Sequence, residues 1–465
     1  MTATSTVPPV VIPSLIEVDC KSGSRAHTVV CYDAYLPESR RMSTDGFVVI
    51  HVAVVQGDAG APSDPVVLLH GGPAVPMMAG FLPDVGNGFQ LMYGNRDVIV
   101  FDQRGTGFAA DPRLNCPLEE TYRDSLQNDI AESGLEWLAR HTTPCIDDLL
   151  DVDLASFSAR EIASDTSDIV GMLGYSSVNL FGASFGSRIA LTYAALASPS
   201  TVRSVVLEGP YPPDVDGVAR RGEAASAGLG ALFDACRRDP SCNSAYPDLE
   251  PQLVDVATRL DDTPLILTGG EVVNGHRFME VVYRTAYSGS GIQRIPRLIG
   301  DTAQGDLALL SELLDTTAMT FDDVDAIAYF ATVCSTTSPV SSALLASTVE
   351  ALPEGVATYF YRLGMATLDL CEAAGLVGSG TIPGPTSAPT LYLVGTYDPV
   401  TPPEWSRDGA NGSWPGMVAE LSYGTHANLF HPESCAGQAV FAFVATLEHP
   451  HLPCLSTTSP IDFDL

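Results

Sequence analysis

A serine flanked by small residues is the first candidate for covalent chemistry in this chain. Residues 182–186 read Gly-Ala-Ser-Phe-Gly; an apolar, β-branched stretch precedes them and a helical pattern follows them. A serine on such a strand–turn–helix corner projects its hydroxyl away from the sheet, and small residues two positions away on each side let strand and helix approach closely. The pattern therefore predicts Ser184 as a nucleophile near the positive end of a helix.

Two residues later in the chain could activate Ser184, one as the base that accepts its proton and the other as the acid that orients this base. Residues 395–402 read Gly-Thr-Tyr-Asp-Pro-Val-Thr-Pro after one apolar stretch, and residues 424–427 read Gly-Thr-His-Ala after the next. A histidine takes the serine proton and later gives it to the leaving group, while an aspartate fixes the tautomer of the imidazole. The order serine, aspartate, histidine, each after its own strand, predicts Asp398 as the acid and His426 as the base.

Two other residues are weaker candidates for these roles. His431 is a rival base, but the Pro-Glu-Ser that follows it is typical of a helix start. Asp102 opens the stretch Asp-Gln-Arg-Gly and precedes Ser184 in the chain, which makes it the weaker acid. We interpret this stretch as a turn in which Asp102 and Arg104 tie neighbouring loops together.

Acyl transfer through a serine also needs N–H groups that stabilise the oxyanion of a tetrahedral intermediate. The amide of Phe185, immediately after Ser184, is one expected donor. The other is expected from residues 70–73, His-Gly-Gly-Pro, which follow an apolar stretch. Proline has no N–H, so Gly72 is the predicted donor. We interpret His70 as a residue that braces this loop.

Residues near these loops are candidates for substrate binding. Met77 and Met78 follow the glycine loop and, with the ring of Phe185, would suit an apolar pocket. Ordinary core packing is the alternative for the two methionines. Glu208 closes a predicted strand and could place a carboxylate in the same site.

The elements that must position these residues alternate between strand and helix. Strands are expected at residues 46–56, 65–69, 98–102, 178–181, 202–207, 390–395 and 417–422, and helices at residues 159–173, 187–196 and 435–447. Such alternation is typical of an α/β fold with a mostly parallel sheet covered by helices on both faces.

In the middle of the chain the sequence pattern changes, because predicted helices follow one another without predicted strands between them. This predicts an inserted helical cap. The expected division is an N-terminal extension at residues 1–40, a core in two parts at 41–214 and 384–465, and the cap at 215–383.

Composition limits the partners of the protein. Acidic residues exceed basic ones, 56 against 23, which gives the 465-residue chain a net charge of −33. This charge repels phosphate backbones and anionic lipids, so we expect a small-molecule substrate and no nucleic acid or membrane partner. No run of about 18 apolar residues predicts a membrane span. No cofactor or metal is expected, since zinc-site spacings are lacking. The oligomeric state stays open, with a homodimer as one candidate.

The ten cysteines fall into five pairs of sequence neighbours. We expect disulfides, with Cys236–Cys242 and Cys435–Cys454 the safest pairs, and therefore an oxidising compartment, secreted or periplasmic. Residues 1–19 lack the basic start and unbroken apolar run of a signal peptide, so a cytoplasmic location is the alternative.

Taken together, the motifs at residues 70–73, 102–107, 182–186 and 398–402, with His426, resemble those of the α/β-hydrolase family of proline iminopeptidases and tripeptidyl aminopeptidases. They are also similar, more loosely, to hydrolases of macrocyclic lactones such as zearalenone. The resemblance spans most of the chain. It implies an α/β-hydrolase fold with a helical cap and the triad Ser184, Asp398 and His426.

Two positions depart from the aminopeptidase pattern. Family members often have glycine where Ala74 stands, and their caps carry carboxylates for the substrate ammonium, often shortly after a cysteine. Here residues 334–338 read Cys-Ser-Thr-Thr-Ser, without a carboxylate. An unpaired ammonium in a dry pocket is costly, which argues against a free-amine substrate, although Glu208, Asp214 or Glu280 could substitute.

Three functions follow from these observations. The favoured one is a serine hydrolase that cleaves a carboxylic ester or lactone of an uncharged, largely apolar substrate through an acyl-enzyme. The alternative is an exopeptidase of the proline iminopeptidase or tripeptidyl aminopeptidase kind. A binding protein built on a disabled hydrolase fold is disfavoured, because the sequence holds a complete set of triad candidates.

Overall fold

The computed structural model describes most of the chain. It covers residues 11–465 apart from 21–26, 42–45, 81, 83–84, 108–109, 119–121, 123, 128–131, 148, 150, 320–323, 379–382, 427–432 and 457–459.

Nine strands form one sheet in the order β1-β2-β3-β5-β4-β6-β7-β10-β11. Every pairing from β5 to β11 is parallel, whereas β1, β2 and β3 pair antiparallel. The strands are β1 (Ser14–Val18), β2 (Val29–Pro37), β3 (Phe47–Val55), β4 (Val66–Leu69), β5 (Val98–Phe101), β6 (Val178–Ala183), β7 (Val202–Glu208), β10 (Thr390–Gly395) and β11 (Met417–Leu421).

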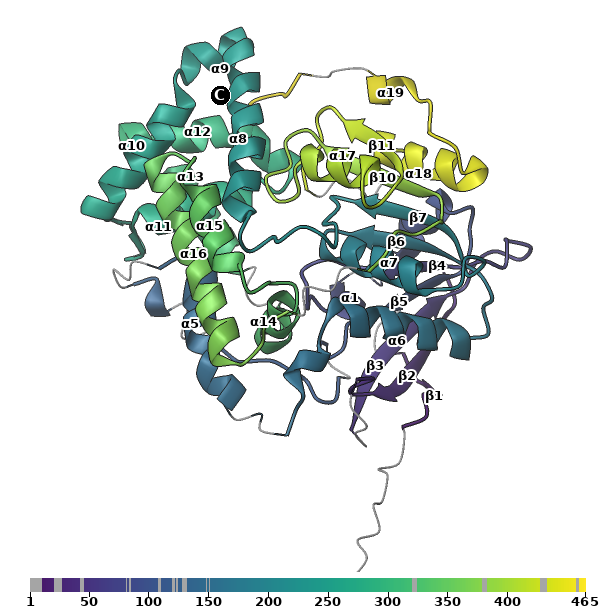
Figure 1. The fold of residues 1–465 in the computed structure, drawn as a ribbon. Coiled ribbons are helices and arrows are strands. Elements are labelled where there is room, and N and C mark those ends of the chain that lie inside the picture. Colours follow the sequence, from purple (N-terminus) through teal and green to yellow (C-terminus); the bar gives the residue numbers. More distant parts are fainter. Residues whose placement is uncertain are drawn as a thin grey trace, which may run out of the picture.

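Helices cover both faces of this sheet (Figure 1). One face packs against α6 (Ala159–Met172), α7 (Phe185–Leu196) and α17 (Pro403–Asn411). The other packs against α1 (Met77–Gly80), α3 (Gln90–Met92) and α18 (Cys435–Thr446). Every residue of β4, β6 and β10 is buried, as a strand covered on both faces requires. The predicted fold class is confirmed.

A second group of helices lies between β7 and β10 in the chain and builds its own buried cluster (Figure 1). Its short hairpin consists of β8 (Leu265–Ile266) and β9 (Val272–Val273). Its helices are α8 (Arg221–Arg238), α9 (Pro240–Ala245), α10 (Leu249–Asp262), α11 (Gly275–Thr285), α12 (Gly289–Gln304), α13 (Ala308–Met319), α14 (Ala326–Cys334), α15 (Ser341–Val349) and α16 (Glu354–Ala373). We call this group the cap.

Three other segments take positions that the sequence patterns did not indicate. β1 and β2, within the expected N-terminal extension, are strands of the main sheet. Helix α5 (Gly134–Asp147) precedes β6 in the chain but packs against α14 and α16 of the cap. The C-terminal tail returns to the cap, where the amide of Asp464 donates to the carbonyl of Gln293 at 3.0 Å.

All ten cysteines form disulfides, each between neighbours in the sequence. Both pairs predicted from the sequence are confirmed. Cys236–Cys242 joins α8 to α9, and Cys435–Cys454 joins α18 to the short helix α19 (Pro453–Ser456). The remaining bonds are Cys20–Cys31, Cys116–Cys145 and Cys334–Cys371.

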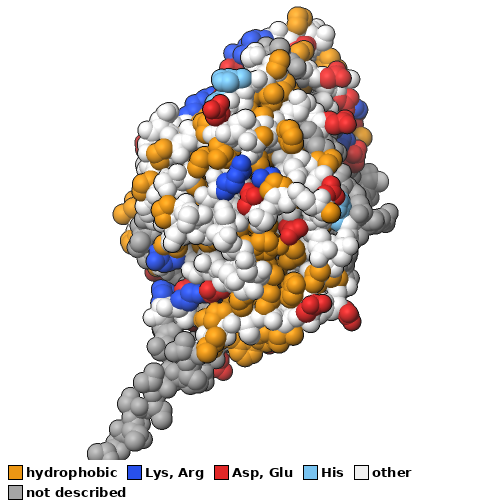
Figure 2. Space-filling view, turned by 90° about the vertical axis from the view of Figure 1, so that its right-hand side faces the viewer, with side chains coloured by type: hydrophobic (Ala, Val, Ile, Leu, Met, Phe, Trp, Pro, Cys, Tyr) orange, Lys and Arg blue, Asp and Glu red, His pale blue; other side chains and the backbone are white. Residues whose placement is uncertain are grey.

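The surface mixes apolar and charged side chains. Figure 2 shows one face on which hydrophobic side chains gather in the lower half, while basic side chains occur singly or in small groups. Within the described part of the chain, no helix has the length and hydrophobicity needed to cross a membrane.

Candidate active site

The corner between β6 and α7 holds Ser184 in an unusual backbone conformation. Its φ of 50° and ψ of −122° lie outside the regions that L-residues favour. A side chain at Gly182 would meet the backbone of residues 186 and 187 within 2.7 Å, and one at Gly186 would meet the carbonyl oxygen of Leu69 at 1.9 Å. The small residues at these positions are therefore what allows the sharp turn that lifts the serine hydroxyl off the sheet.

The structure brings the three predicted side chains together in series. The Oγ of Ser184 lies 2.9 Å from Nε2 of His426, and Nδ1 of the same imidazole lies 2.9 Å from Oδ2 of Asp398. The residues follow β6, β10 and β11. These strands are parallel, β7 alone lies between β6 and β10, and their carboxyl ends share one edge of the sheet. That topology explains how residues 184, 398 and 426 converge.

Asp398 is fully buried and is held by its own loop. Its Oδ1 accepts the amides of Val400 and Thr401 at 2.8 and 2.9 Å, and its Oδ2 accepts the hydroxyl of Thr401 at 2.8 Å. These bonds fix the carboxylate opposite Nδ1 of His426. The loop that follows β10 thus orients the acid before any substrate arrives.

The charges around His426 favour its protonated form. Burial alone would lower the pKa of the imidazole, but the charge and hydrogen bond of Asp398, together with the charge of Glu208, raise the pKa above the ordinary value of 6.5. The ring of Tyr287 from the cap lies edge-on to the imidazole, with 5.6 Å between ring centroids.

A pH profile tests this arrangement. Only neutral imidazole accepts the serine proton, so hydrolysis is expected to rise with pH on an acid limb centred above pH 6.5. Glu208→Gln removes a charge that raises this pKa and is expected to move the limb to lower pH. Glu350→Gln, an exposed residue beyond α15, is the matched control. A limb that stays in place in Glu208→Gln would contradict the expected coupling.

The glycine loop after β4 lies directly beside the serine. A side chain at Gly71 would come within 2.7 Å of Cβ of Ser184, and Gly72 lines the cavity next to it. Phe185 is the first residue of α7, so its amide has no acceptor within the helix. These positions are compatible with the two predicted oxyanion donors.

Gln103 holds this loop in place from the turn after β5. Its Oε1 accepts the amide of Ala74 at 3.1 Å and its Nε2 donates to the carbonyl of His70 at 2.9 Å. Ala74 has a φ of 60°, in the left-handed region, where glycine is the least strained residue. His70 is half-buried, and its burial lowers the pKa of the imidazole to about 4.

Asp102 and Arg104 tie loops together, in line with our interpretation of that turn. Arg104 donates to Asp165 from Nε and Nη2 at 2.7 Å, and from Nη1 to the carbonyl of Ser156 at 2.9 Å. Asp102 does not contact the triad, because its Oδ1 accepts the amides of residues 77 and 78 at 2.7 and 3.0 Å. Burial raises the pKa of Asp102 to about 6.

Met77 and Met78 require a correction. Both side chains are buried in the apolar cluster between the sheet, α3 and α18, and neither lines a cavity at Ser184. The bonds to Asp102 start a helix at this point and turn the two methionines into the core. The structure thus supports the core-packing alternative. Glu208, by contrast, lies in the cavity wall and accepts the amide of Ser184 at its carbonyl oxygen, at 2.8 Å.

A cavity of about 440 Å³ opens beside Ser184 and His426, between the sheet and the cap. Much of its wall is aliphatic or aromatic. Its charged lining consists of Glu208, Arg221, Glu280 and Arg284, and its tyrosines are Tyr283, Tyr287, Tyr329 and Tyr359. Charged side chains therefore share this cavity with its apolar wall.

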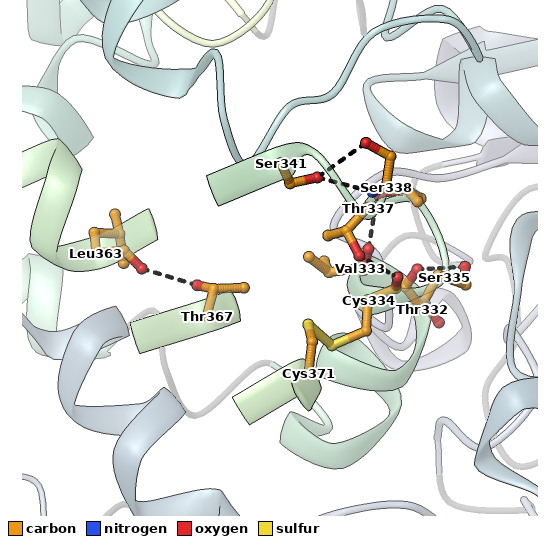
Figure 3. The surroundings of a disulfide bond; sticks show 11 residues. Thr332, Val333, Cys334, Ser335, Thr337, Ser338, Ser341, Leu363, Thr367 and Cys371 are labelled. Carbon is orange, nitrogen blue, oxygen red and sulfur yellow. Dashed lines mark hydrogen bonds between the residues drawn. A yellow bond between two sulfur atoms is a disulfide. The ribbon is translucent and has the colours of Figure 1, made fainter. Parts of the chain in front are cut away.

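The segment after Cys334 carries no carboxylate and turns its hydroxyl groups back to the chain (Figure 3). Ser335 donates to the carbonyl of Thr332 at 2.6 Å, and Thr337 donates to that of Cys334 at 2.8 Å. The disulfide to Cys371 fixes the end of α14 against α16. The hydroxyls of Ser335 and Thr337 therefore satisfy carbonyl groups at the end of α14.

Helix α5 supplies part of the cavity wall, although the sequence patterns did not place it there. Leu135 and Leu138 line the cavity, and the amide of Gly134 donates to Oε2 of Glu280 at 2.6 Å. The spacing of the two leucines is helical, but Pro144 interrupts the pattern within the same helix.

His431, the rival base, lies outside the described residues. Among the residues that are described, no group of three or more His, Cys, Asp or Glu side chains is placed to hold a metal ion.

Comparison with known proteins agrees with this fold. Residues 64–231 match the family model described as alpha/beta hydrolase fold, and residues 367–455 match the one described as TAP-like protein. The chain therefore belongs to the α/β-hydrolase family, and its C-terminal part is of the TAP-like kind. It is an enzyme of the α/β-hydrolase superfamily.

Comparisons with curated proteins and with solved structures give no further information on the activity. No curated protein matches the chain. Among solved structures, an esterase from Exiguobacterium antarcticum has 14% identity and a TM-score of 0.33, covering 86% of this chain and 97% of its own. A thermophilic esterase from Thermogutta terrifontis has 16% identity and a TM-score of 0.33, covering 87% and 96%. Similarity at this level does not bear on the activity of the present chain.

Proposed function

We propose that the protein is a serine hydrolase that cleaves a carboxylic ester or lactone through an acyl-enzyme on Ser184. The observation that carries the proposal is the continuous series of contacts from the serine hydroxyl through His426 to Asp398 at the wall of a cavity. A serine paired with a base that is oriented by a third group is the arrangement of an activated nucleophile.

The proposed reaction follows from this geometry. His426 removes the proton from Ser184 as Oγ attacks the carbonyl carbon, and the imidazolium then protonates the departing alcohol oxygen. Water, activated by the same imidazole, attacks the acyl-enzyme and releases the acid. The amides of Gly72 and Phe185 would stabilise the oxyanion at both stages; loss of one such donor typically costs about 2.7–4 kcal/mol.

A second candidate is an exopeptidase, which two observations favour. Glu280 is buried in the cap, lines the cavity with Ser184, and its Oε1 has no hydrogen-bond partner among the described residues. Burial raises the pKa of this carboxyl group. A substrate ammonium would supply the missing partner and a compensating charge. The TAP-like match at residues 367–455 points in the same direction.

One substrate panel separates the two candidates. The panel compares a p-nitrophenyl ester and an aromatic macrolactone with alanine and proline naphthylamides. We expect turnover of the ester or the lactone; cleavage of the naphthylamides with negligible ester turnover would favour the exopeptidase instead. In that case Glu280→Gln should reduce arylamide cleavage about 10- to 100-fold, as removal of a charged hydrogen-bond partner does. Glu350→Gln serves again as the control.

We also propose that the protein works in an oxidising compartment, outside the cell or in the periplasm. The support is the set of five disulfides, which persist in such compartments and are rare in the cytosol.

A further inference from the structure

Arg221 occupies a central place in the cavity system. It lines both the cavity of about 440 Å³ and a smaller one of about 70 Å³, and Gly72, Ser184 and Tyr329 line both as well. The guanidinium therefore faces the space in which a substrate of Ser184 would lie. Nothing in the proposed acyl transfer uses this residue.

Arg221 has no acidic partner among the described residues. Within the described part of the chain its guanidinium has one hydrogen bond, to the hydroxyl of Tyr329 at a long 3.5 Å, although a guanidinium offers five N–H donors. The preceding residue, Arg220, forms a salt bridge with Glu223 at 2.7 Å. The contrast is not due to a shortage of acids, since the chain has 56 acidic and 23 basic residues.

In the cavity, the lack of a carboxylate partner makes the charge of Arg221 energetically unfavourable. Burial disfavours the charged guanidinium, and the groups that favour its charge most are the tyrosines at 283, 287 and 329, none of which is a carboxylate. Arginine keeps its proton in proteins, so it cannot escape the cost by becoming neutral. A bound anion would supply the missing counter-charge.

We propose that Arg221 binds a carboxylate of the substrate, so that this enzyme acts on carboxylate-bearing acyl compounds. The inference rests on the proposed function of Ser184. The planar guanidinium fork matches a carboxylate, to which it donates two parallel hydrogen bonds. Glu208 and Glu280 line the same cavity, and their charges oppose a dianion such as a phosphate ester; a singly charged carboxylate fits better.

Two esters test the proposal. One is the neutral p-nitrophenyl butyrate and the other is mono-p-nitrophenyl glutarate, which carries a carboxylate on its acyl chain. At low salt, and after subtraction of uncatalysed hydrolysis, we expect the glutarate ester to have the higher kcat/KM. Arg221→Gln is expected to lower the glutarate-to-butyrate ratio of kcat/KM about 10- to 100-fold, mainly through KM.

Two further variants show whether charge is responsible. Arg221→Lys keeps the cation and should retain part of the ratio, whereas Arg294→Gln removes a surface arginine paired with Glu312 and should leave the ratio unchanged. Equal ratios in the wild type and Arg221→Gln, or a wild-type preference for the neutral ester, would overturn the proposal.

A binding measurement separates failure of this proposal from failure of the proposed function. Calorimetry measures the binding of monomethyl glutarate to Ser184→Ala and to the double variant Ser184→Ala/Arg221→Gln. Neither protein has to hydrolyse the ligand for its binding to be measured. Binding that is lost in the double variant supports the carboxylate site even if the wild type hydrolyses no ester. Equal binding to both proteins contradicts the site, whatever the ester assays show.

Discussion

Ser184→Ala is expected to lower hydrolysis about 10⁶-fold, the size of effect seen when a triad serine is removed. The alanine lacks the oxygen that would form the acyl bond, while His426, Asp398 and the glycine loop keep their positions. Only the oxyanion donors and substrate binding would then contribute. Their residual effect in such enzymes is about 10³–10⁴-fold over water.

A fluorophosphonate probe gives a readout that needs no knowledge of the substrate. The wild type should gain the mass of one phosphonyl adduct, mapped by peptide analysis to Ser184, and Ser184→Ala should gain none. Ser347→Ala is the matched control, because Ser347 is exposed on α15 and far along the chain from the triad. Labelling that persists in Ser184→Ala would mean that another residue is the nucleophile.

The sequence was sufficient to predict those elements whose structure depends on short-range patterns. Strands such as β4 and β10 read as continuous apolar runs because both faces are covered, and the predicted strand at residues 390–395 coincides with β10. The corner at Ser184 was predictable because its steric requirement falls on Gly182 and Gly186, whose small size is visible in the sequence.

Two kinds of element were not indicated by the sequence. Strands β1 and β2 were assigned to an extension, although each pairs antiparallel with the next strand in the chain, β2 and β3 respectively. The other case depends on long-range packing. Helix α5 precedes β6 yet packs on α16, more than 200 residues later. No periodicity reports such contacts.

The pocket was the least predictable part for the same reason. Met77 and Met78 follow the glycine loop in sequence. Their amides donate hydrogen bonds to Asp102, and their side chains then lie in the core. The charged groups of the cavity come from β7, α8 and α11, so Arg221 becomes visible as a candidate only when these elements are assembled.

Asp398→Asn is expected to leave a folded protein that hydrolyses its substrate about 10⁴-fold more slowly. The asparagine oxygen can still accept the amides of Val400 and Thr401, which now bond to Oδ1. Its NH₂ group would then face Nδ1 of His426, which must become an acceptor. The proton moves to Nε2, and that nitrogen can no longer take the proton of Ser184.

The measurement is kcat with the best ester of the panel, together with the thermal unfolding temperature of each variant. Asp408→Asn is the matched control, because it makes the same exchange at an exposed position on α17 in the same region. A loss of rate with an unchanged unfolding temperature assigns the effect to the tautomer of His426. If Asp398→Asn instead keeps nearly the full rate, another group orients the imidazole, and Thr401, whose hydroxyl lies 3.2 Å from Nδ1, is the residue to test next.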